Sequence, residues 1–206
     1  MRVLLINGSP HARGCTFTIL SEVARPLEAA GIEAEWFHIG DGPIRGCTGC
    51  RGCGKTARCV YTDDGVNACV ERLCQADGLV VGSPVYYAGP NGALCAFLDR
   101  LFFNKSKLYA YKPAAAVVNC RRGGASSAFD RLNKYFTISR MPVVSSQYWN
   151  ASHGFTPEEV LQDSEGMQIM RALGKNMAWM LQAIAKEGTA GVQAQQEKTI
   201  MTNFIR

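Results

Sequence analysis

Charged residues are scarce in this sequence, and neither sign dominates. Asp, Glu, Lys and Arg make up 19% of its 206 residues, against about 25% in an average domain. Hydrophobic residues make up 47%, which excludes intrinsic disorder as the main state. The formal net charge of +5 is too small to predict nucleic-acid binding by itself. The length favours a single domain, which we place over residues 1–206.

Segments suited to cross a membrane or to direct secretion are also lacking. The uncharged stretch 78–98 contains Pro84, Pro90 and four glycines, which a spanning helix tolerates poorly. The apolar run before Gly8 is too short for the apolar region of a secretion signal. We therefore expect a soluble, cytoplasmic protein. In that compartment the nine cysteines should be mostly thiols, and an odd number cannot all pair within one chain.

Short apolar runs alternate with segments of helical spacing along the whole chain. The runs predict strands at 2–6, 32–39, 78–82, 113–119 and 141–145. Between them we expect helices from Thr16 to near Gly31, over 65–76 and 92–103, up to Ile138, and over 165–186, before an irregular tail at 187–206. Continuous apolar strands are typical of a parallel sheet covered on both faces. We predict an α/β fold, a flavodoxin-like three-layer sandwich with a five-stranded parallel sheet of order 2-1-3-4-5.

The loop after the first expected strand, residues 8–16, has the chemistry of a phosphate site. It opens a helix, whose first N–H groups are free and whose dipole favours an anion. Ser9 and Thr16 offer hydroxyls, and His11 and Arg13 offer cationic donors. An ordinary strand-to-helix turn is the alternative. The loop lacks the Gly-x-Gly-x-x-Gly pattern, so dinucleotide binding of that kind is unsupported.

Four cysteines lie in the long loop at residues 40–62, at Cys47, Cys50, Cys53 and Cys59. Loops of this length are usually functional or disordered. Four closely spaced thiolates can each ligate one iron of a single [4Fe–4S] cluster, although the last gap is longer than in bacterial ferredoxins. A structural zinc site and a free-thiol or disulfide loop remain open alternatives.

The same loop contains a second pattern, which we reject. Gly49, Gly54, Lys55 and Thr56 match the Walker A expression for a phosphate-binding loop. A functional loop of that kind leaves a buried strand and opens a helix. Neither a strand before Gly49 nor an apolar-periodic helix after Thr56 is expected here, so we predict no nucleotide triphosphate site.

Three loop motifs together resemble those of the NADPH-dependent FMN reductase family, and the resemblance extends over nearly the whole chain. They are Gly8-Ser9-Pro10 with Cys15-Thr16, Ser83-Pro84-Val85-Tyr86-Tyr87, and Arg121-Arg122-Gly123-Gly124. The cysteine spacing resembles that of iron–sulfur flavoproteins, a branch of the same family. The resemblance implies FMN as cofactor, a [4Fe–4S] cluster on the four loop cysteines, and NAD(P)H as a possible co-substrate.

The resemblance also implies a role for individual residues. The FMN phosphate would be held by Ser9, His11, Cys15 and Thr16, although Cys15 weakens a hydrogen bond that Asn or Ser commonly makes. The isoalloxazine would be lined by Pro84, Val85, Tyr86, Tyr87 and Gly89, and its far side closed by Cys120, Arg121, Gly123 and Gly124. Core or interface packing is the alternative for the two tyrosines. No side chain is assigned as catalytic, because hydride transfer at the flavin needs no protein acid or base.

The function implied is an FMN-dependent oxidoreductase that passes electrons between a [4Fe–4S] cluster and FMN. An FMN-only NAD(P)H:flavin or quinone reductase is the first alternative, and a non-catalytic zinc or thiol redox protein is the second. We expect a small-molecule or ferredoxin-like electron partner, a homodimer or homotetramer, and no nucleic-acid or membrane partner. Arg121 and Arg122 would either hold the 2′-phosphate of NADPH or belong to a solvated face.

Overall fold

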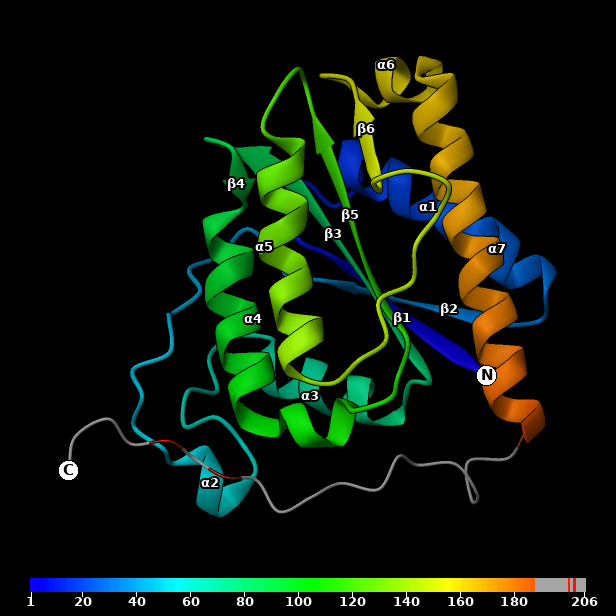
Figure 1. The fold of residues 1–206 in the computed structure, drawn as a ribbon. Coiled ribbons are helices and arrows are strands. Elements are labelled where there is room, and N and C mark those ends of the chain that lie inside the picture. The colour runs from blue at the N-terminus through cyan, green and yellow to red at the C-terminus, as the bar shows by residue number, and fades with distance from the viewer. Residues whose placement is uncertain (188–199, 201, 203–206) are drawn as a thin grey trace.

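The computed structural model describes residues 1–187, 200 and 202, so nearly all of the predicted tail at 187–206 lies outside the described residues. Five parallel strands form the main sheet: β1 (Arg2–Asn7), β2 (Glu33–His38), β3 (Gly78–Tyr86), β5 (Ala114–Cys120) and β6 (Ala151–His153). Their order is β2-β1-β3-β5-β6 (Figure 1). A two-residue strand, β4 (Gly89–Pro90), pairs antiparallel with the end of β3. Counting the parallel strands alone, this is the predicted 2-1-3-4-5 order.

Helices cover both faces of the sheet, as the prediction requires (Figure 1). The faces are separated by the alternation of side chains along each strand. One face carries α3 (Val66–Gln75), α4 (Gly92–Lys105), the 3-10 helix η1 (Ser106–Tyr109) and α5 (Ala125–Ile138). The other carries α1 (Cys15–Ala29), α6 (Pro157–Gln162) and α7 (Ser164–Glu187). A four-residue helix, α2 (Cys53–Thr56), lies in the cysteine loop. In the described part of the chain no helix is long and apolar enough to span a membrane.

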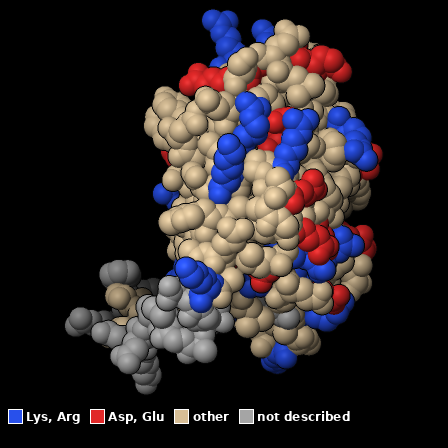
Figure 2. Space-filling model, turned by 90° about the vertical axis from the view of Figure 1, so that its right-hand side faces the viewer, with Lys and Arg blue, Asp and Glu red and all other residues tan. Residues whose placement is uncertain are grey.

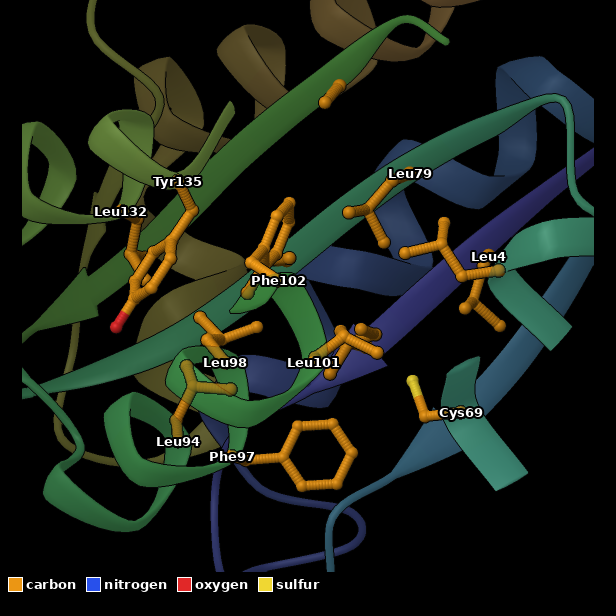
Figure 3. Packing of buried hydrophobic residues seen from close by; sticks show 14 of the residues in the cluster. Leu4, Cys69, Leu79, Leu94, Phe97, Leu98, Leu101, Phe102, Leu132 and Tyr135 are labelled. Carbon is orange, nitrogen blue, oxygen red and sulfur yellow. The ribbon is translucent and has the colours of Figure 1, made fainter. Parts of the chain in front are cut away.

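The larger half of the core lies between the sheet and α3, α4 and α5. Leu4 and Leu79 of the sheet belong to the same buried cluster as Phe97 and Leu101 of α4 and Leu132 of α5 (Figure 3). Each fully buried side chain of this size stabilises the fold by roughly 1.5–3 kcal/mol. One face of α4, which includes Leu94, Phe97 and Leu101, is fully buried and fixes the helix against the sheet. Helix α4 extends from the carboxyl edge of the sheet toward the cysteine loop (Figure 1).

Helices α1 and α7 pack closely on the opposite face. A Cβ at Gly174 would collide with the carbonyl oxygen of Val23, so only glycine allows this approach. Met170 and Met177 of α7 are fully buried in the core on this face. On the side of the molecule that carries α7, basic and acidic side chains are interspersed (Figure 2). There the carboxylate of Glu22 joins the two helices by pairing with Arg171.

The fifth strand is not where the apolar pattern predicts it. Residues 141–145 contribute only one isolated bridge, between Val143 and Ala114. The strand beside the carboxyl half of β5 is β6. Between the two contacts the chain leaves the sheet, and the Nδ2 amide of buried Asn150 donates to the carbonyl oxygen of Ala116 at 3.1 Å. Polar Asn150 thus supplies a bond that a regular strand would have made through its backbone.

Candidate functional site

Three loops meet at the carboxyl edge of the sheet, because β1, β3 and β5 are adjacent and parallel. The backbone N–H of Gly8 donates to the carbonyl of Gly82 at 2.9 Å. The Asn91 side-chain amide donates to the carbonyl of Gly8 at 2.8 Å. On the other side, the Ser127 hydroxyl donates to the carbonyl of Ala88 at 2.6 Å. The three loop motifs singled out in the sequence are therefore neighbours in space.

The loop between β1 and α1 is shaped by Asn7, which sequence reasoning missed. Its Oδ1 accepts from the N–H of Ser9 at 3.1 Å, and its Nδ2 donates to the carbonyls of His11 and Ala12, each at 3.3 Å. The N–H of His11 in turn donates to the Ser9 hydroxyl at 3.1 Å. A polar residue at the end of an otherwise apolar strand was the available signal. Asn7 therefore holds the loop open at the start of α1.

The N-terminus of α1 has the features that a phosphate monoester requires. Gly14 occupies the N-cap without a side-chain cap, and the first turn contains no acidic residue. Thr16 is buried, and its Oγ1 has no hydrogen-bond partner among the described residues. The guanidinium of Arg13 lies 4.3 Å from the centre of the Phe17 ring, which holds a cation beside this end of the helix. Free N–H groups, an unsatisfied hydroxyl and a nearby cation fit an anion here.

Two further side chains border the loop. The Nε2 of His38, at the end of β2, lies 2.8 Å from the carbonyl oxygen of Ser9. The thiol of Cys15 donates to the carbonyl of Phe155 at 3.5 Å. Burial raises the pKa of Cys15, which keeps this thiol neutral. Cys15 therefore presents its backbone N–H to the α1 end while its side chain is directed to the segment after β6.

The motif that begins at Ser83 forms the end of β3 and a tight hairpin to β4. Tyr87 and Ala88 form its turn with φ angles of 50° and 59°. Non-glycine residues in this left-handed region cost about 1–3 kcal/mol each and cluster at functional sites. Tyr86 is half-exposed and Tyr87 fully exposed, so neither packs in the core. The usual Asn-Gly signal for such a turn is absent, which is why the sequence did not predict a hairpin.

The loop between β5 and α5 closes the third side of this edge. Gly124 has a φ of 87°, and a Cβ there would lie 2.6 Å from the Cα of Ala88, so the hairpin can approach only because this residue is glycine. Cys120 is buried, and burial raises its pKa although the N–H groups of Arg122 and Ala125 oppose the shift. Arg121 and Arg122 are exposed. Aromatic side chains, backbone donors and cations thus border one edge, as a flavin requires.

A second candidate site lies in the cysteine loop. Cys47, Cys50, Cys53 and Cys59 all line one hollow, together with Thr48, Arg51, Val60, Tyr61, Arg100 and Phe103. All nine cysteines are free thiols. Within the described chain, no three His, Cys, Asp or Glu side chains are grouped closely enough to hold a single metal ion. The four sulfurs thus line one hollow without converging on a single point. Their number and type fit the ligand set of a [4Fe–4S] cluster, in which each sulfur binds a different iron.

The wall of this hollow contains a buried ion pair that sequence reasoning missed. Arg100 of α4 is 2% exposed and pairs through both terminal nitrogens with the carboxylate of Asp64. Its Nε donates to the sulfur of Cys59 at 3.2 Å. Burial alone lowers the pKa of Arg100, but the hydrogen bonds and charges of Asp64 and Cys59 outweigh burial and raise it. A charge in the middle of the apolar stretch 93–103 was the signal that could have found it.

Asn67 of α3 anchors the end of the cysteine loop. Its Oδ1 accepts from the N–H of Cys59 at 2.8 Å, and its Nδ2 donates to the carbonyls of Cys59 and Tyr61, each at 3.1 Å. Cys53 also lines the hollow, and burial, aided by the neighbouring cysteines, raises its pKa. The short helix α2 ends at Thr56, and no strand precedes Gly49. The strand before the loop and the longer helix after it, which a Walker A loop requires, are therefore both missing from this described segment.

The two regions lie at opposite ends of α4 (Figure 1). Asn91, which holds the carboxyl-edge loops, immediately precedes the helix, whereas Arg100 lies in its second half. At 1.5 Å per residue, the helix rises roughly 14 Å between these two positions. The phosphate-binding features and the four cysteines are therefore separate sites that α4 connects.

The architecture and the three converging loops define a flavodoxin-like α/β protein. Residues 1–156 match the family described as NADPH-dependent FMN reductase. An iron–sulfur flavoprotein of Methanocaldococcus jannaschii is 30% identical over 197 residues, covering 90% of this chain and 100% of the relative. One from Archaeoglobus fulgidus is 31% identical over 175 residues, covering 83% and 86%. The chain therefore belongs to the NADPH-dependent FMN reductase family.

Solved structures agree with this fold. RosB with a bound 8-demethyl-8-formylriboflavin-5′-phosphate intermediate superposes with a TM-score of 0.71 at 17% identity, covering 100% of this chain and 94% of RosB. A flavodoxin, WrbA-like protein from Agrobacterium tumefaciens gives a TM-score of 0.60 at 19% identity, covering 88% and 96%. The predicted flavodoxin-like fold and family are confirmed. Family membership makes the chain a flavin-dependent oxidoreductase that uses FMN.

Proposed function

We propose that this chain is an iron–sulfur flavoprotein that moves electrons between a [4Fe–4S] cluster in the cysteine loop and FMN at the carboxyl edge of the sheet. The observation that carries the proposal is the single hollow lined by Cys47, Cys50, Cys53 and Cys59 in a chain of the FMN reductase family. Relatives that match most of this chain bear the name iron–sulfur flavoprotein, which supports the same function.

The phosphate of FMN is assigned to the loop between β1 and α1. Ser9 and Thr16 offer hydroxyls, and the backbone N–H of Cys15 belongs to the open end of α1. Arg13 supplies a cation at the same loop, and His11 offers a ring N–H donor. Because the Thr16 hydroxyl is buried without an internal partner, an incoming phosphate oxygen would satisfy it rather than compete for it.

The isoalloxazine is assigned to the other two loops. The hairpin lines one side through Pro84, Val85, Tyr86, Tyr87 and Gly89, and the segment of Cys120, Arg121, Gly123 and Gly124 closes the far side. When bound, FMN would supply hydride-transfer and single-electron-transfer chemistry. These transfers need no acidic or basic side chain of the protein. The residues of this edge orient the ring and exclude water from one side of it.

The cluster ligands are assigned to the four thiolates of the cysteine loop. Cys59 is held in place from α3 and α4, whereas Cys47 and Cys50 lie in the exposed part of the loop. The cluster supplies one-electron transfer when bound. Arg100 and Asn67 hold the end of the cysteine loop against α3 and α4. Binding of the cluster would therefore require only the exposed cysteines to move, and not the whole loop.

Partners and location complete the proposal. We expect NAD(P)H or a ferredoxin-like protein as reductant, with Arg121 and Arg122 available for a phosphate group of the nucleotide. We expect a homodimer or homotetramer, which would cover the exposed aromatic residues Tyr87 and Trp149. Analytical ultracentrifugation measures this oligomeric state. Nine cysteines without a disulfide favour a reducing compartment such as the cytoplasm.

The deciding experiment is elemental analysis of protein purified without oxygen. Iron, acid-labile sulfide, zinc and FMN are measured per chain. Near four irons and four sulfides per FMN supports the proposal. FMN without iron or sulfide identifies a simple flavin reductase, and one zinc without FMN identifies a non-catalytic protein. Either of the last two results rejects an iron–sulfur flavoprotein.

A matched pair of variants assigns the ligands. Cys50→Ser removes an exposed sulfur of the hollow and should abolish stoichiometric iron while FMN content stays unchanged. Cys74→Ser changes a cysteine of α3 outside the hollow and should leave both iron and FMN at the wild-type level. Equal iron in the two variants would contradict the assignment.

A further inference from the structure

One of the four hollow-lining cysteines differs from the others in its surroundings. Among the side chains that the structure describes, Cys59 alone has a sulfur that accepts a hydrogen bond from a charged group, the 3.2 Å bond from Nε of Arg100. Its backbone is also fixed on both sides by the amide of Asn67. Cys47 and Cys50 are exposed, by contrast. The four sulfurs are therefore not electrically equivalent.

Arg100 is held so firmly that its charge has a fixed position. Its two terminal nitrogens pair with Asp64 and also donate to the carbonyls of Arg45 at 3.3 Å and Tyr61 at 3.2 Å. These carbonyls lie at the two ends of the cysteine loop. One side chain thus joins both ends of the loop to α4 and keeps its Nε directed at Cys59. Both charged groups are almost fully buried, so solvent screens them little.

We propose that Arg100 and Asp64 together set the reduction potential of the cluster through the sulfur of Cys59. The inference rests on the proposed function and deepens it. Hydrogen bonds to the sulfurs and nearby charge are among the properties that set the potential of such clusters. Arg100, as a cation in contact with one sulfur, stabilises the more negative, reduced state. Asp64 is an anion on the far side of the guanidinium and weakens that stabilisation.

The electron balance of the step is simple. One electron from an external reductant converts the cluster from the 2+ to the 1+ state. With four thiolate ligands, the net charge of the site changes from −2 to −3, and no bond is formed or broken. Arg100 carries its proton throughout. The only effect of the ion pair is therefore electrostatic, and it acts most strongly on the state with the added electron.

The test compares two variants that should shift the potential in opposite directions. Arg100→Gln removes the cation and should lower the ratio of reduced to oxidised cluster at a fixed applied potential by about tenfold, which is about 59 mV for one electron. Asp64→Asn removes the anion but keeps the shape and an acceptor oxygen, so the ratio should rise. A merely structural role would not produce opposite signs. Arg100→Lys keeps the charge and should shift the ratio less than Arg100→Gln.

The control is Arg58→Gln, which removes the same charge from a neighbour of Cys59. The side chain of Arg58 pairs with Glu71 and is exposed, so the expected shift is small. Each protein is loaded anaerobically and titrated with redox mediators, and the cluster is followed by electron paramagnetic resonance. The FMN potential of the same sample should stay unchanged, because the flavin edge lies at the other end of α4.

The outcomes separate this inference from the proposed function. Opposite shifts for Arg100→Gln and Asp64→Asn support it, and if Arg100→Gln does not hold a cluster, opposite shifts for Arg100→Lys and Asp64→Asn support it equally. Equal potentials, or shifts of the same sign, overturn it while leaving the iron–sulfur function intact. A wild-type protein with FMN but no iron overturns both, and elemental analysis detects that result before any titration.

Discussion

The carboxyl edge of the sheet and the cysteine loop are built by different means. The edge is set first by the backbone, because parallel strands end together and glycines at positions 8 and 124 allow the loops to touch. The side chains of Asn7 and Asn91 then add hydrogen bonds within it. The cysteine loop contains only the short helix α2 and is held by side chains, chiefly Arg100 and Asn67. A site made by strand ends is specified by topology. A site held by a few side chains depends on each of them. We therefore expect substitutions that disrupt one region to leave the other intact.

The largest effect is expected where a buried charge loses its partner. Arg100→Ala leaves the buried carboxylate of Asp64 unpaired, which should lower the free energy of unfolding by about 3–5 kcal/mol. Urea denaturation followed by circular dichroism measures this. The control Arg58→Ala breaks an exposed pair and should cost about 1 kcal/mol or less. Similar losses for the two variants would mean that the cysteine loop is not held by Arg100.

The next effect tests the anchor from α3. Asn67→Ala leaves the N–H of Cys59 and the carbonyls of Cys59 and Tyr61 without their partner, at a cost of about 1–3 kcal/mol. Amide hydrogen exchange should become faster in the cysteine loop and stay unchanged in the loop between β1 and α1. Faster exchange in both loops would show that the two regions are one cooperative unit, contrary to the comparison.

The matching change at the carboxyl edge is Gly8→Ala. The added Cβ would collide with the Leu94 side chain and lie 2.7 Å from the carbonyl oxygen of Gly82, an overpacking that costs about 1–3 kcal/mol. FMN affinity, measured by flavin fluorescence, should fall because the phosphate loop is displaced. Gly42→Ala adds a Cβ with no atom within 4 Å, and both quantities should stay at wild-type values. Unchanged FMN binding in Gly8→Ala would remove this loop from the flavin site.

The smallest effect isolates one hydroxyl. Thr16→Val keeps the shape of the side chain and removes an oxygen that has no internal partner, so stability should change by less than about 0.5 kcal/mol. If the hydroxyl meets the phosphate, FMN affinity should fall by about five- to tenfold, from the loss of one hydrogen bond of about 1–1.5 kcal/mol. Riboflavin, which lacks the phosphate, should bind both proteins equally. A matching loss for riboflavin would place Thr16 elsewhere in the site.

The flavin edge could be largely predicted from the sequence, but the wall of the cysteine hollow could not. The three motif loops follow apolar strands, and parallel strands bring their ends together whatever the detailed packing. Arg100 reaches Cys59 across 41 positions of sequence, and Asn67 reaches it across eight. No local pattern encodes such contacts. Sequence reasoning also placed the fifth strand one segment too early, because apolar residues at 141–145 resemble a strand while the short β6 does not.

By itself the sequence determined what depends on neighbouring residues. Apolar runs, turn residues and the spacing of Cys47 to Cys59 are local, and they predicted the sheet order, the phosphate loop and the cysteine site. The tertiary structure alone decided which side chains meet across the fold. It placed a buried cation on the sulfur of Cys59, left the hydroxyl of Thr16 unsatisfied, and put the two sites toward opposite ends of α4. These contacts come from the packing of α3 and α4 on the sheet, which is set by the whole core and not by any one segment.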